Sequence, residues 1–379
     1  MIYLDHAATS WPKAPGVAEA VAQALISPVG NVGRSAHPMA LAAARILYDC
    51  RLALQEIVHT SAPEKTVFTR NATEALNIAI LGSLAPEGRV LTTAVEHNAV
   101  ARPLHHLMSN GVHVDTCACD VYGIADAADF DRRLGTGSYD LVVFTAANNL
   151  TGAVNPIRSL VESCIRHHVP FVIDAAQAMG EMDIPRFGEG AQGALCFSLH
   201  KGLLGPSGVG VMGLYGDFSP RPLIYGGTGS RSDSVEQPDF LPDRYESGTS
   251  AIAVIAGAKA ALDHMAIHGQ AINHERKRLA DILWDDLSRI GQLRMLGPRE
   301  GRSPIVSVTV REGSIDRLAQ ALFAKQVAVR SGFHCAPLAH RHLGTEVHGG
   351  AIRFSVGHTN TEAELQMVSD TIREVCDGR

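Results

Sequence analysis

A lysine at the bend between two apolar runs is the first residue of this sequence that could do chemistry. The run 194–197 leads into Ser198, His200 and Lys201, and a glycine-rich turn then leads into the run 209–212. This pattern predicts a strand, a loop that carries Lys201, and a second strand. Buried neighbours lower the pKa of such a lysine, and its amine can then attack an aldehyde. The alternative is a surface lysine on an ordinary turn.

An aspartate ends another apolar run and needs a partner. The run 170–173 precedes Asp174, and Gln177 follows about one turn later. A carboxylate at the end of a buried strand is costly unless a cation lies near it. The protonated ring nitrogen of pyridoxal phosphate would be such a cation, with Gln177 donating to the phenolic oxygen. A helix-capping aspartate at a strand end is the alternative.

The segment after a predicted strand at 66–69 predicts a helix that runs to about residue 84 and could bind phosphate. Asn71 is a good N-cap, and Glu74 follows it as in a capping box. Backbone N–H groups at a helix N-terminus attract anions, and the Thr73 hydroxyl adds a donor. Ordinary capping explains the same residues, so both interpretations stay open at this point.

Two further polar side chains follow predicted strands. His97 comes just after the strand 90–94, and Asn149 follows the strand 141–145. The carboxyl ends of parallel strands are where α/β sheets bind their ligands. The flat imidazole of His97 could stack on an aromatic ring at this edge. A loop histidine with its own hydrogen bonds is the alternative.

Composition limits the classes of protein to which the chain can belong. A length of 379 residues favours one large and one smaller domain, and 46% hydrophobic with 19% charged residues is typical of a soluble globular protein. The formal net charge of −6 gives no electrostatic footprint for nucleic acid. No apolar run approaches the roughly 18 residues of a membrane span, and the start lacks a secretory signal. We therefore expect a cytoplasmic protein that binds neither nucleic acid nor membranes.

The cysteines and histidines do not form a metal-binding pattern. Seven cysteines are scattered along the chain without paired CxxC spacing, so neither a disulfide framework nor a structural zinc site is expected. Eighteen histidines are many, but no pair has the spacing of an HExxH-like motif. We expect no metal.

The predicted elements alternate between strands and helices and then change character. An irregular stretch at 219–248 is long enough to be functional or covered by a partner. An α+β unit follows it. Other predicted elements are helices at 15–26, 39–59, 251–264, 272–290, 315–324 and 361–376, a loop at 30–35, and strands at 112–117, 305–310, 327–330 and 351–356.

Together, these residues form motifs whose order and spacing resemble a known family. The motifs are the segments 3–9, 71–74, 96–97, 174–177 and 198–201, and the segments 245–249, 330–338 and 351–355 also fit. They are similar to the cysteine desulfurases and selenocysteine lyases, which belong to the class V aminotransferase group of fold-type I pyridoxal phosphate enzymes. The resemblance spans the whole chain.

The resemblance implies an α/β fold of two domains. The large domain, residues 15–260, would bind pyridoxal 5'-phosphate on a mixed, mainly parallel sheet flanked by helices. Residues 1–14 and 261–379 would form a smaller α+β domain that carries the loop of the catalytic cysteine. The step at 330–336 resembles the members that have a short catalytic loop.

Position by position, the resemblance implies three catalytic residues, Lys201, Cys335 and His97. Lys201 would hold the cofactor and move the α-proton, His97 would stack on the ring, and Cys335 would accept the sulfur as a persulfide. Asn149 and Arg353 would bind the substrate carboxylate. The implied cofactor-binding residues are Ala72, Thr73, His97, Asp174, Gln177, Ser198, His200, Lys201 and, from the neighbouring subunit of a homodimer, Thr249.

The implied activity is a cysteine desulfurase that converts L-cysteine to L-alanine and passes the persulfide sulfur to an acceptor protein. Because only a thiolate can attack sulfur, His334 or a nearby cation should favour that form of Cys335. A selenocysteine lyase, an aminotransferase of the same group and a catalytically silent scaffold remain alternatives. His6, Asn98 and the pair at 146–147 depart from residues common in the family and should tune the substrate side.

Overall fold

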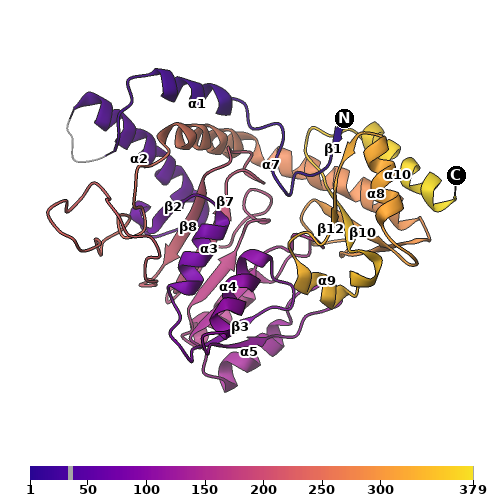
Figure 1. The fold of residues 1–379 in the computed structure, drawn as a ribbon, viewed down its shortest axis with the longest axis horizontal. Helices are drawn as coiled ribbons and strands as arrows, with labels where there is room; N and C mark the ends of the chain where they lie inside the picture. Colours follow the sequence, from indigo (N-terminus) through magenta and orange to yellow (C-terminus); the bar gives the residue numbers. More distant parts are fainter. Residues whose placement is uncertain (33–36, 379) are drawn as a thin grey trace.

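A seven-stranded sheet forms the centre of the larger part of the protein (Figure 1). The computed structural model describes residues 1–32 and 37–378. The strands are β2 (Thr66–Thr69), β3 (Arg89–Thr92), β4 (His113–Thr116), β5 (Leu141–Thr145), β6 (Phe171–Asp174), β7 (Gly193–Ser198) and β8 (Gly210–Tyr215). Their order is β2-β8-β7-β6-β5-β3-β4, with parallel pairing from β4 to β7 and β8 antiparallel to both neighbours. The predicted mixed, mainly parallel sheet is confirmed.

Helices cover both faces of this sheet, which explains why its strands read as continuous apolar runs. Successive residues of β5 point to opposite faces, so Val142 and Phe144 join one buried cluster while Leu141 and Val143 join another. The first cluster includes α2, α5 and α6, and the second includes α3 and α4. The helices of this part are α1 (Val17–Ile26), α2 (Pro38–Val58), η1 (Pro63–Lys65), α3 (Ala72–Leu81), α4 (Asn98–Met108), α5 (Ala127–Thr136) and α6 (Ile157–Arg166).

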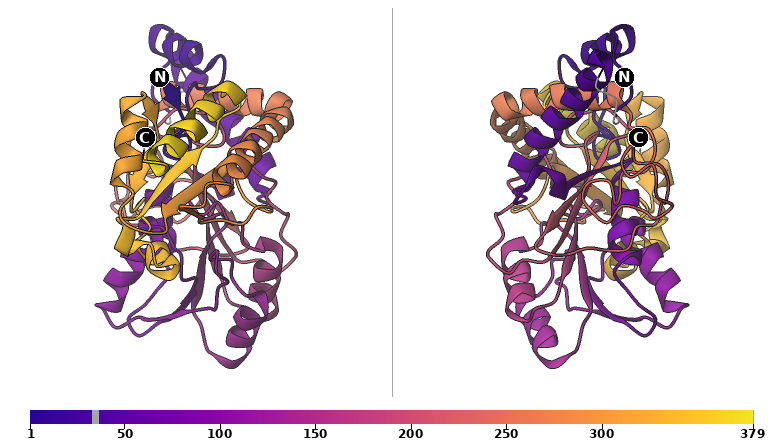
Figure 2. Two further views of the ribbon diagram at one scale, coloured as in Figure 1. Left: turned by 90° about the vertical axis from the view of Figure 1, so that its right-hand side faces the viewer. Right: turned by 90° about the vertical axis from the view of Figure 1, so that its left-hand side faces the viewer.

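A second, antiparallel sheet forms the core of the smaller part, at the right of Figure 1. Its order is β12-β13-β10-β9, and the short strand β1 pairs in parallel with β11 beside it. Both chain ends lie on this part, as Figure 2 shows from the side. The elements are β1 (Ile2–Tyr3), β9 (Leu293–Met295), β10 (Ile305–Val310), α8 (Asp316–Ala324), β11 (Val327–Ala328), β12 (Arg330–Gly332), α9 (Pro337–Leu343), η2 (Glu346–His348), β13 (Ala351–Ser355) and α10 (Glu362–Cys376).

One long helix, α7 (Ile252–Ser288), runs from the larger part to the smaller part (Figure 1). The prediction of two separate helices at 251–264 and 272–290 is wrong, because Gly269 lies buried inside a continuous helix. The cost of a mid-helix glycine, about 1 kcal/mol, is outweighed by packing against α1, α2 and α10. The expected domain boundary at residue 260 falls inside α7, and the division of domains there stays a prediction.

The remaining predictions about the chain's course have mixed outcomes. The irregular stretch 219–248 contains no helix or strand among its residues, all of which the structure describes. Of the predicted loop at 30–35, residues 33–35 lie outside the described residues. The helix α9, immediately after Cys335, was not predicted. In the described part of the chain, no helix is both long enough and apolar enough to cross a membrane.

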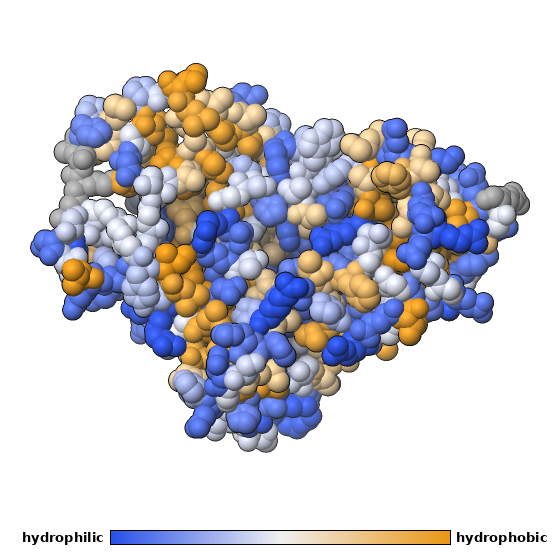
Figure 3. Space-filling model, viewed as in Figure 1, coloured by the Kyte–Doolittle hydropathy of each residue, from blue (hydrophilic) through white to orange (hydrophobic). Residues whose placement is uncertain are grey.

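Hydrophobic side chains gather on the outer face of α1, at the upper left of Figure 3. Leu25 and Ile26 at the end of this helix are 72% and 78% exposed. The N-terminal residues behave differently, since Ile2 and Leu4 are buried in the core of the smaller part together with Leu279 and Phe354. The start of the chain is therefore a structural part of the C-terminal unit.

We predict that Leu4→Ala lowers the free energy of unfolding by about 2–5 kcal/mol, because it leaves a cavity in a core where Leu4 is 0% exposed. Denaturant titration followed by tryptophan fluorescence would measure this change. Met1→Ala is the matched control, since Met1 is 88% exposed and its truncation should change stability by less than about 0.5 kcal/mol. Equal stability of the two variants would contradict the packing of the N-terminal segment.

Candidate active site

One cavity at the carboxyl edge of the large sheet collects most of the residues predicted from the sequence. They come from the start of α3, from the loops after β3 and β5, and from the ends of β6 and β7. This is the edge at which parallel α/β sheets bind ligands. The predicted residues that line the cavity are Ala72, Thr73, His97, Asn149, Asp174, Gln177, Ser198, His200 and Lys201.

Lys201 lies in the loop 199–209 between β7 and β8. The next residue has to be glycine, because a Cβ on Gly202 would lie 2.5 Å from the carbonyl oxygen of Met179. Burial lowers the pKa of Lys201, and the positive charge of Arg353 acts in the same direction, whereas Asp174 opposes both. A larger share of the amine is therefore neutral than for a lysine in water, as a nucleophile or base requires.

Asp174 is the anion that faces this lysine. Its side chain is 4% exposed, and Oδ1 accepts a hydrogen bond from the backbone N–H of Ala176 at 2.9 Å. Within residues 1–32 and 37–378, no lysine, arginine or histidine forms an ion pair with it. A buried carboxylate without a cationic partner matches the needs of a protonated pyridine nitrogen.

A second carboxyl group, Glu96, lies buried near Asp174 and was not singled out from the sequence as a functional residue. Its Oε1 accepts from the hydroxyl of Thr93 at 2.6 Å and from the N–H of Thr145 at 3.1 Å. Burial, with a smaller contribution from Asp174, raises the pKa of Glu96 to about 8. Glu96 is therefore mostly protonated at neutral pH, which leaves Asp174 as the anion of the pair.

The start of α3 forms a cradle of donors suited to a phosphate. Asn71 caps the helix as predicted, with its Oδ1 accepting from the N–H of Glu74 at 3.0 Å. The capping box is incomplete, because the Glu74 carboxylate accepts from the N–H of Arg70 rather than from that of Asn71. The N–H of Ala72 donates to Ser198 Oγ at 2.8 Å, so the Ser198 hydroxyl hydrogen stays available to a ligand.

One histidine with unused hydrogen-bonding capacity and one glycine complete the surroundings of this cradle. His200 Nδ1 is buried without a partner among the described residues, and burial lowers the pKa of this histidine to about 4, so the ring is neutral. Gly210 lets β8 approach the helix start, since a Cβ there would lie 2.3 Å from the carbonyl carbon of Asn71. The phosphate interpretation of this helix end fits the structure.

His97 and Gln177 occupy the positions expected for contacts with a ring. His97 is the N-cap of α4, and its Nδ1 accepts from the N–H of Ala99 at 3.0 Å. Burial lowers the pKa of His97, so the ring is a neutral imidazole whose proton is on Nε2. Gln177 Nε2 donates to the carbonyl of Ala7 at 2.9 Å, and its Oε1 is buried without a partner in the described chain.

Arg353 is 1% exposed and contacts Asn149, which lines the cavity, but it is not itself among the lining residues. Its Nη2 donates to Asp5 Oδ1 at 2.8 Å and its Nη1 to the carbonyl of Asn149 at 3.0 Å. Its Nε is buried without a partner among the described residues. No local pattern in the sequence indicates the pairing of Asp5 with Arg353, because 348 positions separate them.

Asn149 has a different contact from the one expected. Its Nδ2 donates to the carbonyl of His334 at 2.9 Å, so this amide holds the loop before Cys335 in addition to lining the cavity. The role of Asn149 in binding a substrate carboxylate stays a prediction.

Cys335 is exposed at the mouth of the site, and an arginine holds its sulfur. Arg330 Nη2 lies 3.3 Å from Cys335 Sγ, and the N–H of Asn98 donates to the carbonyl of Cys335 at 2.8 Å. A second hollow is lined by Cys335 together with Thr73 and His97, and the last two also line the cavity that contains Lys201. The thiol therefore opens onto the same cleft as Lys201.

Of the two predicted partners for the thiolate, the cation is Arg330. His334 cannot serve, since its ring nitrogens face the carbonyl of Arg330 at 3.1 Å and the ring of His340 at 3.4 Å. Burial and the charge of Arg353 lower the pKa of His334 to about 3, which keeps it neutral. Among the other thiols, burial raises the pKa of Cys50 to about 12, whereas the contact with the Cys117 side chain lowers the pKa of Cys119 to about 7.

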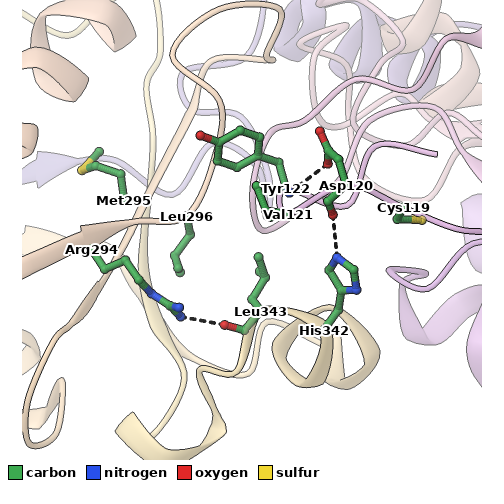
Figure 4. A pocket seen from close by; sticks show the side chains of 9 residues that line it. All are labelled: Cys119, Asp120, Val121, Tyr122, Arg294, Met295, Leu296, His342 and Leu343. Atoms are coloured by element: carbon green, nitrogen blue, oxygen red, sulfur yellow. Dashed lines mark hydrogen bonds between the residues drawn. The ribbon is translucent and has the colours of Figure 1, made fainter. Parts of the chain in front are cut away.

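Thr249 and one further pocket lie outside this cavity. Thr249 is exposed directly after the irregular stretch 219–248 and does not line the cavity of its own chain. A separate pocket between the two parts of the protein contains none of the predicted site residues. Figure 4 shows it: Cys119 comes from the larger part and Arg294 and His342 from the smaller part, and His342 lies next to Asp120.

Comparisons with known proteins identify the family of the chain. The family model for class-V aminotransferases matches residues 2–368. A probable cysteine desulfurase of Methanothermobacter thermautotrophicus is 30% identical over 99% of this chain and 94% of its own length. A probable cysteine desulfurase of Aeropyrum pernix is 29% identical over 100% of this chain and 95% of its own length. The apo structure of a cysteine desulfurase from Thermococcus onnurineus covers 100% of this chain and 95% of its own, with a TM-score of 0.90 and 26% identity.

We predict that Arg330→Gln slows the alkylation of Cys335 by iodoacetamide about three- to tenfold at pH 7, because the cation beside the thiolate is lost. Peptide mass spectrometry of timed samples would measure the rate at Cys335 alone. Arg341→Gln is the matched control, since Arg341 is an exposed arginine on the helix that follows and should leave the rate unchanged. A normal rate in Arg330→Gln would contradict the assigned ion contact.

Proposed function

The chain belongs to the class-V aminotransferase family, and we propose that it is a pyridoxal-phosphate-dependent cysteine desulfurase that converts L-cysteine to L-alanine. One observation supports this most strongly: a lysine, a buried aspartate and a helix N-terminus share a cavity, and a thiol beside an arginine lines the adjoining hollow. The relatives and the solved structure named above carry the same activity in their names.

The residues of the cavity fit pyridoxal phosphate on both its charged ends. Asp174 would pair with the ring nitrogen, and the α3 start with Thr73, Ser198 and His200 would hold the phosphate. His97 would stack on the ring and Gln177 would contact its phenolic oxygen. When bound, the cofactor would withdraw electrons from the substrate's α-carbon, which makes its C–H bond acidic and the bond from Cβ to sulfur breakable.

The chain's own residues would carry out the other steps. Arg353, assisted by Asn149, would bind the substrate carboxylate, and the unpartnered Nε of Arg353 offers a free donor for it. Lys201 would attach the cofactor and move the α-proton with its amine. The Cys335 thiolate would attack the substrate sulfur, so that the S–S bond forms as the Cβ–S bond breaks, and protonation at Cβ gives alanine.

We further propose a homodimer in which each subunit completes the other's site. Thr249 supports this, because it lies on an exposed loop away from the cavity of its own chain. An acceptor protein would then remove the persulfide sulfur from the exposed Cys335. A cytoplasmic location suits a chain whose described cysteines are all free thiols, since a reducing compartment keeps such a nucleophile reduced.

We predict that incubation with L-cysteine and pyridoxal phosphate produces alanine together with a persulfide on Cys335. Cys335→Ser should form almost no alanine under multiple-turnover conditions, while Cys376→Ser, which changes a thiol far from the cavity, should behave as wild type. Amino acid analysis and mass spectrometry of the intact protein measure the two products. Alanine without a protein persulfide would refute the role of Cys335.

We predict that Lys201→Ala loses both turnover and the visible absorbance of the covalently held cofactor, because no other lysine lines the cavity as described. Absorbance spectra of the purified variant with added pyridoxal phosphate would show this. Turnover of selenocysteine with strong exclusion of cysteine would make the protein a selenocysteine lyase. Full transamination activity in Cys335→Ala would instead assign it to the aminotransferases.

A further inference from the structure

We propose that His340 and Thr345 are positioning residues for Cys335. They hold His334 in one neutral form, and His334 in turn fixes the loop that presents the thiol to Arg330. The catalytic importance of this arrangement rests on the proposed function, but the arrangement itself can be tested without any turnover.

Three buried side chains form a continuous chain of hydrogen bonds behind the thiol. His334 Nε2 lies 3.1 Å from the carbonyl of Arg330, and His334 Nδ1 lies 3.4 Å from His340 Nε2. His340 Nδ1 lies 2.6 Å from Thr345 Oγ1. His334 is 3% exposed, and His340 and Thr345 are 0% exposed. Water therefore does not compete for these contacts.

The partners at the two ends determine where every proton lies. A carbonyl can only accept, so His334 Nε2 must carry the hydrogen that it donates to Arg330. In a neutral ring His334 Nδ1 is then an acceptor, which requires a hydrogen on His340 Nε2. His340 Nδ1 is then an acceptor in turn, and the Thr345 hydroxyl donates to it. Both rings are in the Nε2–H form, and the hydroxyl ends the chain.

The charged groups around the pair favour this neutral arrangement. Arg330 and Arg353 face His334, and each opposes a positive charge on it, as does His340 itself. Burial is the largest effect and lowers the pKa of His334 to about 3. Burial also lowers the pKa of His340 to about 4, against a smaller opposing contribution from the backbone of Phe333. Neither ring takes up a proton near neutral pH.

The loop needs such a support because its backbone is strained. His334 and Cys335 both have positive φ, 52° and 56°, which residues other than glycine adopt at a cost. Two hydrogen bonds hold the carbonyls, from Asn149 to His334 and from Asn98 to Cys335. The hydrogen-bonded ring of His334 is the third contact, and it ties the strained pair back to α9 and to the turn after it.

The first test measures which ring nitrogens of His334 and His340 carry a hydrogen. In protein labelled with ¹⁵N-histidine, long-range ¹H–¹⁵N spectra should show both buried rings as Nε2–H tautomers that do not titrate between pH 6 and pH 8. Assignment comes from His334→Gln and His340→Gln. An Nδ1–H tautomer or a protonated ring at pH 7 for either histidine would overturn the proposal. The measurement needs no substrate, so it stands whether or not the protein desulfurates cysteine.

The second test measures the reactivity of the Cys335 thiol. His340→Phe and Thr345→Val should each slow alkylation of Cys335 by iodoacetamide about three- to tenfold at pH 7, because the sulfur moves away from the Arg330 guanidinium. His340→Gln and Thr345→Ser restore the required donor and should recover most of the rate. His342→Phe is the matched control, as His342 lies on the same helix but bonds the carbonyl of Asp120 instead (Figure 4).

Two internal references separate positioning from a general loss of structure. Cys376, which is partly exposed in another helix, should be alkylated at the wild-type rate in every variant. In an Arg330→Gln background, His340→Phe should have no further effect, since the cation through which it acts is already absent. Faster alkylation of several cysteines at once, or additive effects of the two substitutions, would overturn the proposal.

Discussion

The buried carboxylate of Asp174 is the constraint on which the rest of the site depends. A charge that is 4% exposed at the end of a parallel strand needs a cation, and the described residues provide no side chain that pairs with it. The nearby Glu96 avoids a second buried anion by staying protonated, with Thr93 and Thr145 satisfying its Oε1. The cavity thus keeps one negative charge for the ring of a cofactor, opposite the amine of Lys201.

The first residues of the chain connect this cavity to the rest of the molecule. Asp5 neutralises the buried Arg353, while the carbonyl of Ala7 accepts from Gln177 and the N–H of Ser10 donates to the carbonyl of His200. Breaking a buried ion pair by removing one partner typically costs about 3–5 kcal/mol. The N-terminal segment therefore holds residues of both sheets in register around the site, although it is far from them in sequence.

Local sequence patterns predict many of the strands and several residues of the site. The strands at 66–69, 141–145 and 305–310 were predicted with the bounds observed, because turn residues flank each apolar run. Asp174 and Lys201 stood out because a charge ends or follows such a run. The contacts of Arg353 with Asp5 and of Asn149 with the loop of Cys335 depend on how distant segments pack, for which periodicity carries no signal. The continuity of α7 through Gly269 is likewise a tertiary effect.

The burial of His334 also explains why Arg330, and not His334, is the cation beside the thiol. A protonated His334 would add a buried positive charge next to Arg330 and the buried Arg353, and its Nδ1 could no longer accept from His340. A guanidinium keeps its charge over the whole range in which proteins work. Two residues therefore share the work. Arg330 places a permanent positive charge beside the sulfur of Cys335, and the neutral, hydrogen-bonded ring of His334 supports the strained backbone. An ionised histidine could not perform both without giving up the contact that holds the loop in place.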